Sequence, residues 1–98
     1  MKKRLSYSPK AVADLNGIWD YTERLWGREQ ARAYTQAIHD ACLRLLAGNG
    51  IAGSYQLGGM ALLKLRVGQH LAFLAEREDG LLVVRILHVR QDIEHALE

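Results

Sequence analysis

Basic and imidazole side chains gather in the second half of the chain, where they could bind an anionic partner. Residues 61–75 and 80–90 together contain four Lys or Arg and no Asp or Glu, whereas acids cluster between them at Glu76, Glu78 and Asp79. A segregation of this kind gives one side of a domain a positive field. The candidate residues for contacting a target are Lys64, Arg66, Arg85, His88 and Arg90.

The remaining reactive side chains predict no metal, cofactor or nucleotide site. The four histidines fall on different predicted elements and lack the spacing of metal ligands. Cys42, the single cysteine, lies on the apolar face of a predicted helix, where a small core side chain is expected. The glycines of residues 48–60 are not followed by the Lys and Ser or Thr of a phosphate-binding loop. We therefore expect neither a metal nor a cofactor.

These side chains must be positioned by a few elements, which the periodicity of the sequence predicts. Residues 5–7 alternate as in a strand, and Ser8-Pro9 is typical of a helix start. Apolar residues then recur every three or four positions up to Gly27, and again over residues 31–46. Two amphipathic helices joined by a very short turn fold back as an antiparallel hairpin.

Beyond the helices the periodicity becomes that of strands. Residues 48–60 contain five glycines and predict a mobile loop. The dipeptides Gly68-Gln69 and Asp79-Gly80 are typical of hairpin turns. Three strands of an antiparallel meander are therefore predicted at residues 61–67, 70–78 and 81–89.

The predicted turns fix which side chains share a face of the sheet. With the second turn placed as above, Leu74 pairs with Arg85, and Ile86 lies on the same face as Phe73. Both faces are largely apolar, and the helical hairpin can cover only one of them. The other needs the C-terminal segment of residues 92–97, a second copy of the chain or a different protein.

Two residue types in the predicted elements have structural alternatives to a binding role. Trp19 and Trp26 lie seven positions apart on one helical face and are expected in the core. Arg85 has apolar neighbours on its strand, so it contacts a target or forms an ion pair with Asp14 or Asp20. The sequence leaves these two roles of Arg85 open.

Composition excludes several classes of protein. The chain has 98 residues, 49% hydrophobic residues, one cysteine and a formal charge of +2. This length fits one domain, and the single cysteine suits a reducing cytoplasm. No apolar run approaches the roughly 18 residues that cross a bilayer. The charge is too small for a dedicated nucleic-acid binder. We expect one cytoplasmic domain with no contact to a membrane.

Four stretches, in order and at matching spacing, resemble ParE-type toxins. The resemblance runs from about residue 5 to residue 97 and implies a single ParE/RelE-like toxin domain over residues 1–98. The expected α+β fold has an N-terminal strand, a helical hairpin on an antiparallel sheet of three to four strands, and a short C-terminal helix or tail. The stretches are residues 8–21, residues 26–31, the turn Gly68-Gln69-His70 with Phe73, and residues 84–92.

The resemblance implies the toxin of a type II toxin–antitoxin module that inhibits DNA gyrase. Such a toxin binds the complex of gyrase with DNA and holds it in the state in which the DNA is cleaved. This binding requires no catalytic residues and no cofactor. A cognate antitoxin, ParD-like and with a ribbon-helix-helix start, would neutralise the chain in a hetero-oligomer. We expect the antitoxin to cover apolar residues of the sheet or helical hairpin. The residues expected to contact it are Leu71, Phe73, Val84 and Ile86.

RelE-type toxins share this fold and cut messenger RNA on the ribosome, which is the alternative interpretation. Such cleavage needs a base for the 2′-OH of the RNA, cations beside the phosphate and an acid. Lys64, His70 and Arg90 are similar in position to basic residues of these nucleases, whereas their C-terminal Tyr has no counterpart beyond His95. A charge of +2 favours the gyrase interpretation, because ribosome-dependent nucleases are markedly basic. A degenerate toxin that only binds an antitoxin is a third interpretation.

Overall fold

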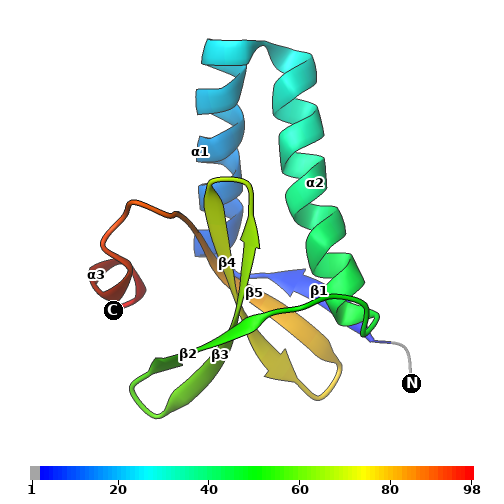
Figure 1. The fold of residues 1–98 in the computed structure, drawn as a ribbon, viewed down its shortest axis with the longest axis vertical. Coiled ribbons are helices and arrows are strands. Elements are labelled where there is room, and N and C mark those ends of the chain that lie inside the picture. The colour runs from blue at the N-terminus through cyan, green and yellow to red at the C-terminus, as the bar shows by residue number, and fades with distance from the viewer. Residues whose placement is uncertain (1–2) are drawn as a thin grey trace.

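The predicted elements form in the predicted order, with one strand more than expected. The computed structural model describes residues 3–98. A helical hairpin packs on one face of a five-stranded sheet, and a short helix lies near the C-terminus (Figure 1). In chain order the elements are β1 (Arg4–Tyr7), α1 (Pro9–Trp26), α2 (Arg28–Leu46), β2 (Gly53–Leu57), β3 (Met60–Val67), β4 (His70–Arg77), β5 (Gly80–His88) and α3 (Ile93–Leu97).

The start of the helical hairpin and the turn between its helices lie at the residues that the sequence predicts for them. Ser8 Oγ accepts a hydrogen bond from the Ala11 amide at 3.0 Å, and Pro9 occupies the first position of α1. Gly27 alone separates α1 from α2 and has a φ of +91°, a conformation that favours glycine. The predicted hairpin is thereby confirmed, and its two helices run side by side (Figure 1).

The sheet has the strand order β1-β5-β4-β3-β2, with β1 parallel to β5 and the other pairs antiparallel. The strand β2 corrects two expectations, the mobile loop and the sheet of three to four strands. Gly58 and Gly59 form a tight turn that places Leu57 opposite Met60. The strand so formed packs Tyr55 and Leu57 against the sheet, so the loop gains apolar contacts that local composition did not reveal.

The turn between β4 and β5 also differs from the prediction. Arg77 pairs with Gly80, which places the turn at residues 78–79 and not at Asp79-Gly80. Gly80 is required instead by the close approach of β1. A Cβ atom on Gly80 would lie 1.9 Å from the carbonyl oxygen of Arg4, so only glycine fits.

A β-bulge next to Phe73 changes which residues of β5 share a face of the sheet. Phe73 pairs with Arg85, whereas the following residue of β4 pairs with Val83. Val84 is therefore the extra residue of the bulge, and the alternation shifts by one position beyond it. Ile86 consequently packs against the helical hairpin and not beside Phe73, so the predicted face of Ile86 is wrong.

Buried apolar side chains form one cluster on each face of the sheet. The inner cluster lies between the helical hairpin and the sheet, and it contains Ile18, Ile38, Cys42, Leu74, Val83 and Ile86. The outer cluster lies on the opposite face and contains Leu62, Phe73, Ala75, Leu87 and Leu97. Leu97 belongs to α3, so the C-terminal segment covers part of the face that the sequence left open.

The far end of the helical hairpin extends past the sheet (Figure 1). Here Tyr21 is 59% exposed, Leu25 54% and Trp26 72%. Trp19 is half-buried and belongs to neither buried cluster. The core position expected for Trp26 is wrong. Apolar spacing places a side chain on the inner face of a helix, yet the sheet ends before it reaches the last turns of α1.

Candidate functional site

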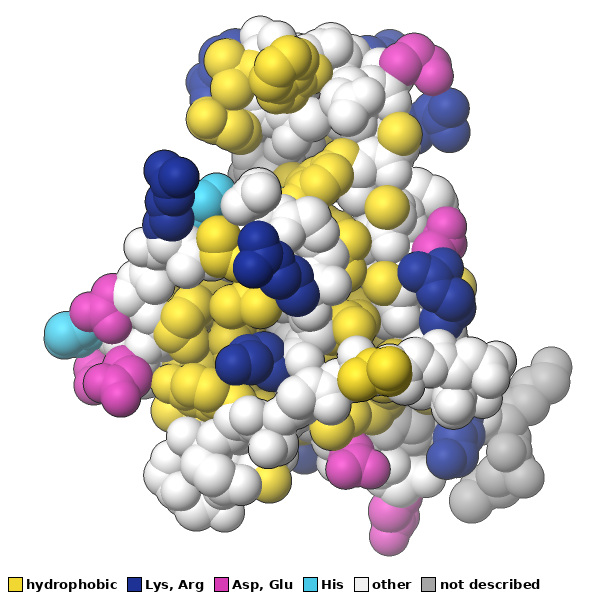
Figure 2. All heavy atoms as spheres, viewed as in Figure 1, with side chains coloured by type: hydrophobic (Ala, Val, Ile, Leu, Met, Phe, Trp, Pro, Cys, Tyr) yellow, Lys and Arg dark blue, Asp and Glu magenta, His cyan; other side chains and the backbone are white. Residues whose placement is uncertain are grey.

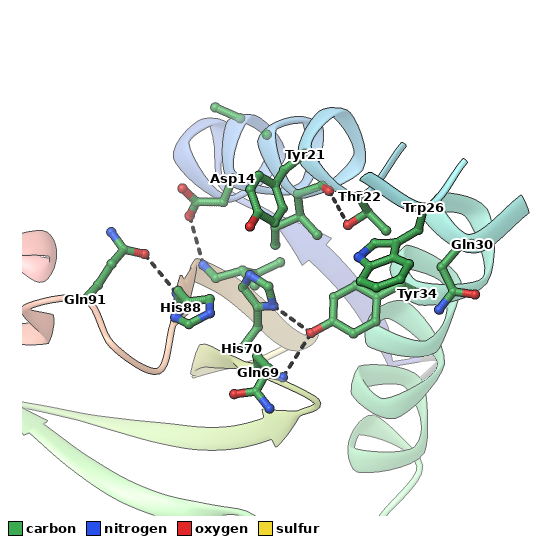
Figure 3. Close-up of a pocket in the computed structure, with 14 residues that line it drawn as sticks. Asp14, Tyr21, Thr22, Trp26, Gln30, Tyr34, Gln69, His70, His88 and Gln91 are labelled. Atoms are coloured by element: carbon green, nitrogen blue, oxygen red, sulfur yellow. Dashed lines mark hydrogen bonds between the residues drawn. The ribbon is translucent and has the colours of Figure 1, made fainter. Parts of the chain in front are cut away.

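A groove of about 650 Å³ lies where the helical hairpin extends past the ends of β4 and β5. Aromatic side chains of the hairpin form one end, and imidazole and carboxamide groups from the sheet side form the other (Figure 3). The residues that line the groove are Ala13, Asp14, Gly17, Ile18, Tyr21, Thr22, Trp26, Gln30, Tyr34, Gln69, His70, Ile86, His88 and Gln91.

Tyr34 joins α2 to the turn between β3 and β4 at the polar end of the groove. Its Oη lies 2.7 Å from His70 Nδ1 and accepts the Gln69 amide at 3.1 Å (Figure 3). The Val67 carbonyl oxygen lies 3.2 Å from the same Oη. Burial lowers the pKa of His70, and the nearby His88 lowers it further. Both effects favour the neutral form of the His70 ring.

His88 stands beside His70 in an edge-to-face arrangement, with ring centroids 5.2 Å apart. The Arg90 amide donates to His88 Nδ1 at 3.1 Å, because the chain turns immediately after β5. The His88 amide in turn donates to Gln91 Oε1 at 2.8 Å. His88 is therefore hydrogen-bonded locally at the end of β5, and the bond from its amide fixes the side chain of Gln91.

Asp14 and Arg85 form an ion pair beside the groove. Arg85 donates from Nε and one terminal nitrogen to the two carboxylate oxygens of Asp14, at 2.8 and 3.0 Å. Asp14 Oδ2 also accepts the Ile86 amide at 2.9 Å, and Arg85 donates to the Ala96 carbonyl oxygen at 2.8 Å. The hydrogen bond to Asp14 raises the pKa of Arg85. Of the two roles left open for Arg85, the ion pair with Asp14 is formed, and contact with a target stays a prediction.

Lys64 and Arg66 lie on the outer face of the sheet, away from the groove. Lys64 pairs with Phe73 and Arg66 with Leu71 across β3 and β4. Figure 2 shows Lys and Arg side chains standing over a hydrophobic patch on this face. Arg66 and Arg90 are exposed, and neither they nor Lys64 form an ion pair with another residue of 3–98.

The whole chain is similar to known toxins. Residues 5–93 match the family described as ParE toxin of type II toxin–antitoxin system, parDE. This chain belongs to the ParE toxin family. Toxin ParE1 of Mycobacterium tuberculosis H37Rv is 35% identical over 98 residues, covering 99% of this chain and all of that toxin. Toxin ParE of Escherichia coli is 39% identical over 85 residues, covering 86% of this chain and 82% of that toxin.

A solved structure supports the ParE-like fold independently. A chain of the chromosomal ParDE TA system from P. aeruginosa superposes with a TM-score of 0.71 at 26% identity, covering 88% of this chain and 95% of that chain. The predicted family and the toxin function in a type II toxin–antitoxin system are confirmed, and the ParE-like interpretation is favoured over the RelE-like one.

The residues named for the RelE-like alternative do not meet at one site in this ParE-type chain. His70 contacts Tyr34 of α2 on the inner face of the sheet. Lys64 lies opposite Phe73 on the outer face, and Arg90 is exposed beyond β5. A base and a phosphate-binding cation must approach the same atoms of one substrate. The sheet separates Lys64 from His70, so this set offers no shared nuclease site.

The four residues expected to contact an antitoxin differ in accessibility. Leu71 and Val84 are half-buried around the outer cluster, and they keep exposed apolar surface. Phe73 is 0% exposed, so a partner could reach it only if the packing opened. Ile86 is 3% exposed, and the little surface that it keeps lies in the lining of the groove. Contact with an antitoxin stays a prediction for all four, and Leu71 and Val84 have the most accessible apolar surface among them.

Other parts of the described chain add two observations. No group of three or more His, Cys, Asp or Glu within residues 3–98 is arranged to hold a metal ion. Over the same range, no helix has the length and apolar character needed to cross a membrane.

Sequence reasoning missed the groove itself. Tyr21, Trp26 and Tyr34 come from the helical hairpin, whereas Gln91 follows β5 more than 50 positions later, and only the fold brings them together. The one signal available was the pair of large aromatic side chains near the hairpin turn, which the helical pattern assigns to a core.

Proposed function

We propose that this ParE-family chain inhibits DNA gyrase and is neutralised by an antitoxin that occupies the groove. The observation that supports this most strongly is the match to ParE toxins over nearly the full length, including 35% identity over 98 residues. The proposed activity is binding, without catalysis: the toxin holds the gyrase–DNA complex after the DNA is cleaved.

The outer face and the segment after β5 are the proposed contacts to the gyrase–DNA complex. Lys64, Arg66 and Arg90 supply positive charge that no neighbouring carboxylate neutralises, since none of them forms an ion pair within residues 3–98. Cations so placed attract DNA phosphates or acidic protein surface. His88 adds a polar contact, whereas Arg85 positions α3 and β5 through Asp14 and Ala96.

The groove is the proposed antitoxin site. It exposes Trp26 and Tyr21 at one end, and large aromatic side chains in a pocket are typical anchors of protein interfaces. We propose a ParD-like antitoxin with a ribbon-helix-helix start, which forms a cytoplasmic hetero-oligomer with the chain. Part of that antitoxin extends to Leu71 and Val84 on the outer face.

A cleavage assay with purified gyrase tests the target. The wild-type chain should accumulate cleaved plasmid, and a variant with Lys64→Ala, Arg66→Ala and Arg90→Ala should lose most of this effect without losing its thermal stability. A matched control changes Arg24, Arg28 and Arg32, at the far end of the helical hairpin, to Ala. This control should still accumulate cleaved plasmid. Codon-level cuts in translated messenger RNA, with gyrase unaffected, would refute the proposal in favour of a nuclease.

A further inference from the structure

The strand β2 lies at one edge of the sheet and lacks the features that usually protect an edge. It pairs with β3, and no other strand of residues 3–98 pairs with its outer side. Its sequence, GSYQL, contains no charged residue and no proline, and it pairs with β3 residue for residue, without a bulge. An edge without charge, proline or bulge is a template for a further strand.

The turn after β2 determines which of its backbone groups point outward. Leu57 pairs with the residue that follows a two-residue turn, so these two form a hydrogen-bonded pair. The alternation of an antiparallel ladder then directs the N–H and C=O groups of Tyr55 and Gly53 toward β3 as well. The N–H and C=O groups of Ser54 and Gln56 therefore point away from β3, and we call these four groups the open edge of β2.

A cation reaches this open edge from the neighbouring strand. Lys64 of β3 pairs with Gly53, so the two residues share the outer face of the sheet. A Cβ atom on Gly53 would lie 3.7 Å from Lys64 Cε, which means that the Lys64 stem crosses from β3 over the backbone of β2. Lys64 forms no ion pair within residues 3–98. Its ammonium group is one bond beyond Cε, so an unneutralised positive charge lies beside the open edge.

Apolar surface adjoins the same edge. Ile51, two residues before β2, is 94% exposed, and Met60, just after the turn, is 50% exposed. Tyr55 and Leu57 are half-buried where they pack against the outer cluster. A strand added to β2 would cover part of this surface and satisfy the open edge.

We propose that an extended segment of the antitoxin adds to the sheet as a sixth strand along the open edge of β2, with an acidic side chain on Lys64. This inference rests on the proposed antitoxin binding and gives the antitoxin a second contact besides the groove. Backbone hydrogen bonds to Ser54 and Gln56 supply affinity, and the side chains of the added strand supply specificity. Because Lys64 is also a proposed contact to the gyrase–DNA complex, the added strand withdraws it from that target.

The register of β2 fixes the side-chain pattern of the antitoxin segment. Residues directly opposite each other in a sheet share a face, so the residue opposite Gly53 carries the Asp or Glu that meets Lys64. The residues opposite Tyr55 and Leu57 lie on the same face and are apolar. The segment therefore has an acidic residue with apolar residues two and four positions away, after it in a parallel strand and before it in an antiparallel one.

A second copy of this chain fits the open edge less well. Two β2 strands can form backbone hydrogen bonds to each other, but residues 41–75 contain no Asp or Glu. A second copy paired through β2 would therefore bring no carboxylate to Lys64. The charge beside the edge favours an acidic partner over self-association.

Amide hydrogen exchange, followed by NMR, tests the proposal on the wild-type chain. In the free chain the Ser54 and Gln56 amides should exchange rapidly, whereas the Tyr55 amide is protected by β3. In the toxin–antitoxin complex, exchange of the Ser54 and Gln56 amides should slow by about tenfold or more. The Trp26 indole N–H reports separately on the groove.

Substitutions at the same positions measure what the backbone groups contribute. Ser54→Pro and Gln56→Pro each remove one outward N–H, and proline is tolerated where the N–H of an edge strand faces solvent. Each should weaken antitoxin binding by about tenfold, whereas Ser54→Ala and Gln56→Ala keep the N–H and should lose far less. Arg28→Pro is the matched control and should bind as the wild type does, because Arg28 holds the first position of α2, which suits proline.

The contact of Lys64 is tested by removing its charge. Lys64→Met keeps the length of the stem, and antitoxin binding should weaken about fivefold and become less sensitive to salt. One Asp or Glu of the antitoxin segment, changed to its amide, should give a loss that is non-additive with Lys64→Met. Unchanged affinity in Lys64→Met would overturn the acidic contact.

The outcomes distinguish this proposal from antitoxin binding at the groove. An antitoxin that shifts the Trp26 indole signal but leaves the Ser54 and Gln56 amides unprotected would overturn the sixth strand and leave the proposed function intact. Protection of these amides in the toxin alone, lost on dilution, would assign the edge to a second copy and also overturn the proposal. A wild-type chain that binds no antitoxin would fail both proposals together.

Discussion

Replacing Asp14 with Ala should destabilise this toxin more than any other change to an Asp or Glu in residues 3–98. The Asp14 carboxylate accepts two hydrogen bonds from Arg85 and one from the Ile86 amide, all at 3.0 Å or less. The Asp14 and Arg85 side chains are only 15% and 19% exposed. The change leaves a partly buried guanidinium without its counterion and a buried amide without an acceptor.

The expected loss follows from these two groups. An unsatisfied buried amide costs about 1–3 kcal/mol. Breaking a buried ion pair costs about 3–5 kcal/mol, and the remaining exposure of Arg85 brings its share toward about 2 kcal/mol, since water can reach it. We expect a total near 3 kcal/mol, a large part of the roughly 5–15 kcal/mol that holds a domain of this size together.

Urea unfolding measures this loss, and a 3 kcal/mol change should lower the midpoint by at least about 1 M. Asp14→Asn keeps an acceptor for the Ile86 amide and should lose less. Asp14→Ala combined with Arg85→Met should lose less than the sum of the single changes, because the pair is removed together. Hydrogen exchange in α3 should also accelerate in Arg85→Met, since Arg85 donates to the Ala96 carbonyl.

Two results would refute this reasoning. A midpoint shift worth less than about 0.5 kcal/mol for Asp14→Ala would mean that the ion pair adds nothing beyond a surface contact. If the losses of stability from Asp14→Ala and Arg85→Met simply add in the double variant, Arg85 is stabilised by groups other than Asp14. Arg85 would then be available to contact a target.

Three further predictions concern other parts of the chain. Gly80→Ala should cost about 3 kcal/mol or more in urea unfolding, because the new Cβ would meet the Arg4 carbonyl; Gly59→Ala, with open space around it, is the control. Trp26→Ala should leave thermal stability within about 0.5 kcal/mol yet weaken antitoxin binding about tenfold or more by calorimetry, whereas Leu43→Ala, outside the groove, should do neither. Burial raises the pKa of Cys42 to about 11 from 9.0, so the unfolded chain releases this proton first and stability should fall by about 1 kcal/mol from pH 9 to pH 10. Cys42→Ala should show a shallower fall over that range, and an unchanged slope would contradict the assigned burial effect.

The helical hairpin was predictable because its causes are local. The Ser8-Pro9 start, the glycine between the helices and the apolar spacing each act within a few residues. The turn between β3 and β4 was predictable for the same reason, and Val67 pairs with His70 as the Gly68-Gln69 turn predicts. The similarity to ParE toxins also followed from short stretches in a fixed order.

Tertiary contacts explain the predictions that failed. The sequence signal at Asp79-Gly80 is that of a hairpin turn, but Gly80 is needed where β1 approaches β5 from more than 70 positions away. The bulge beside Phe73 turns Ile86 to the inner face, although nothing in the alternation of β5 marks it. The glycine-rich loop yields a strand because β3 offers it a free edge.

The sequence by itself therefore determined the order of every element except β2 and the toxin family of this protein, since these depend on periodicity and on stretches read along the chain. Only the tertiary structure decided the site. It brought Trp26 and His88 to one groove, paired Arg85 with Asp14 across 71 positions, and placed Lys64 and His70 on opposite faces of the sheet. Those outcomes depend on where the sheet ends, on one bulge and on which acid lies nearest in space, and none of these quantities is encoded in local spacing.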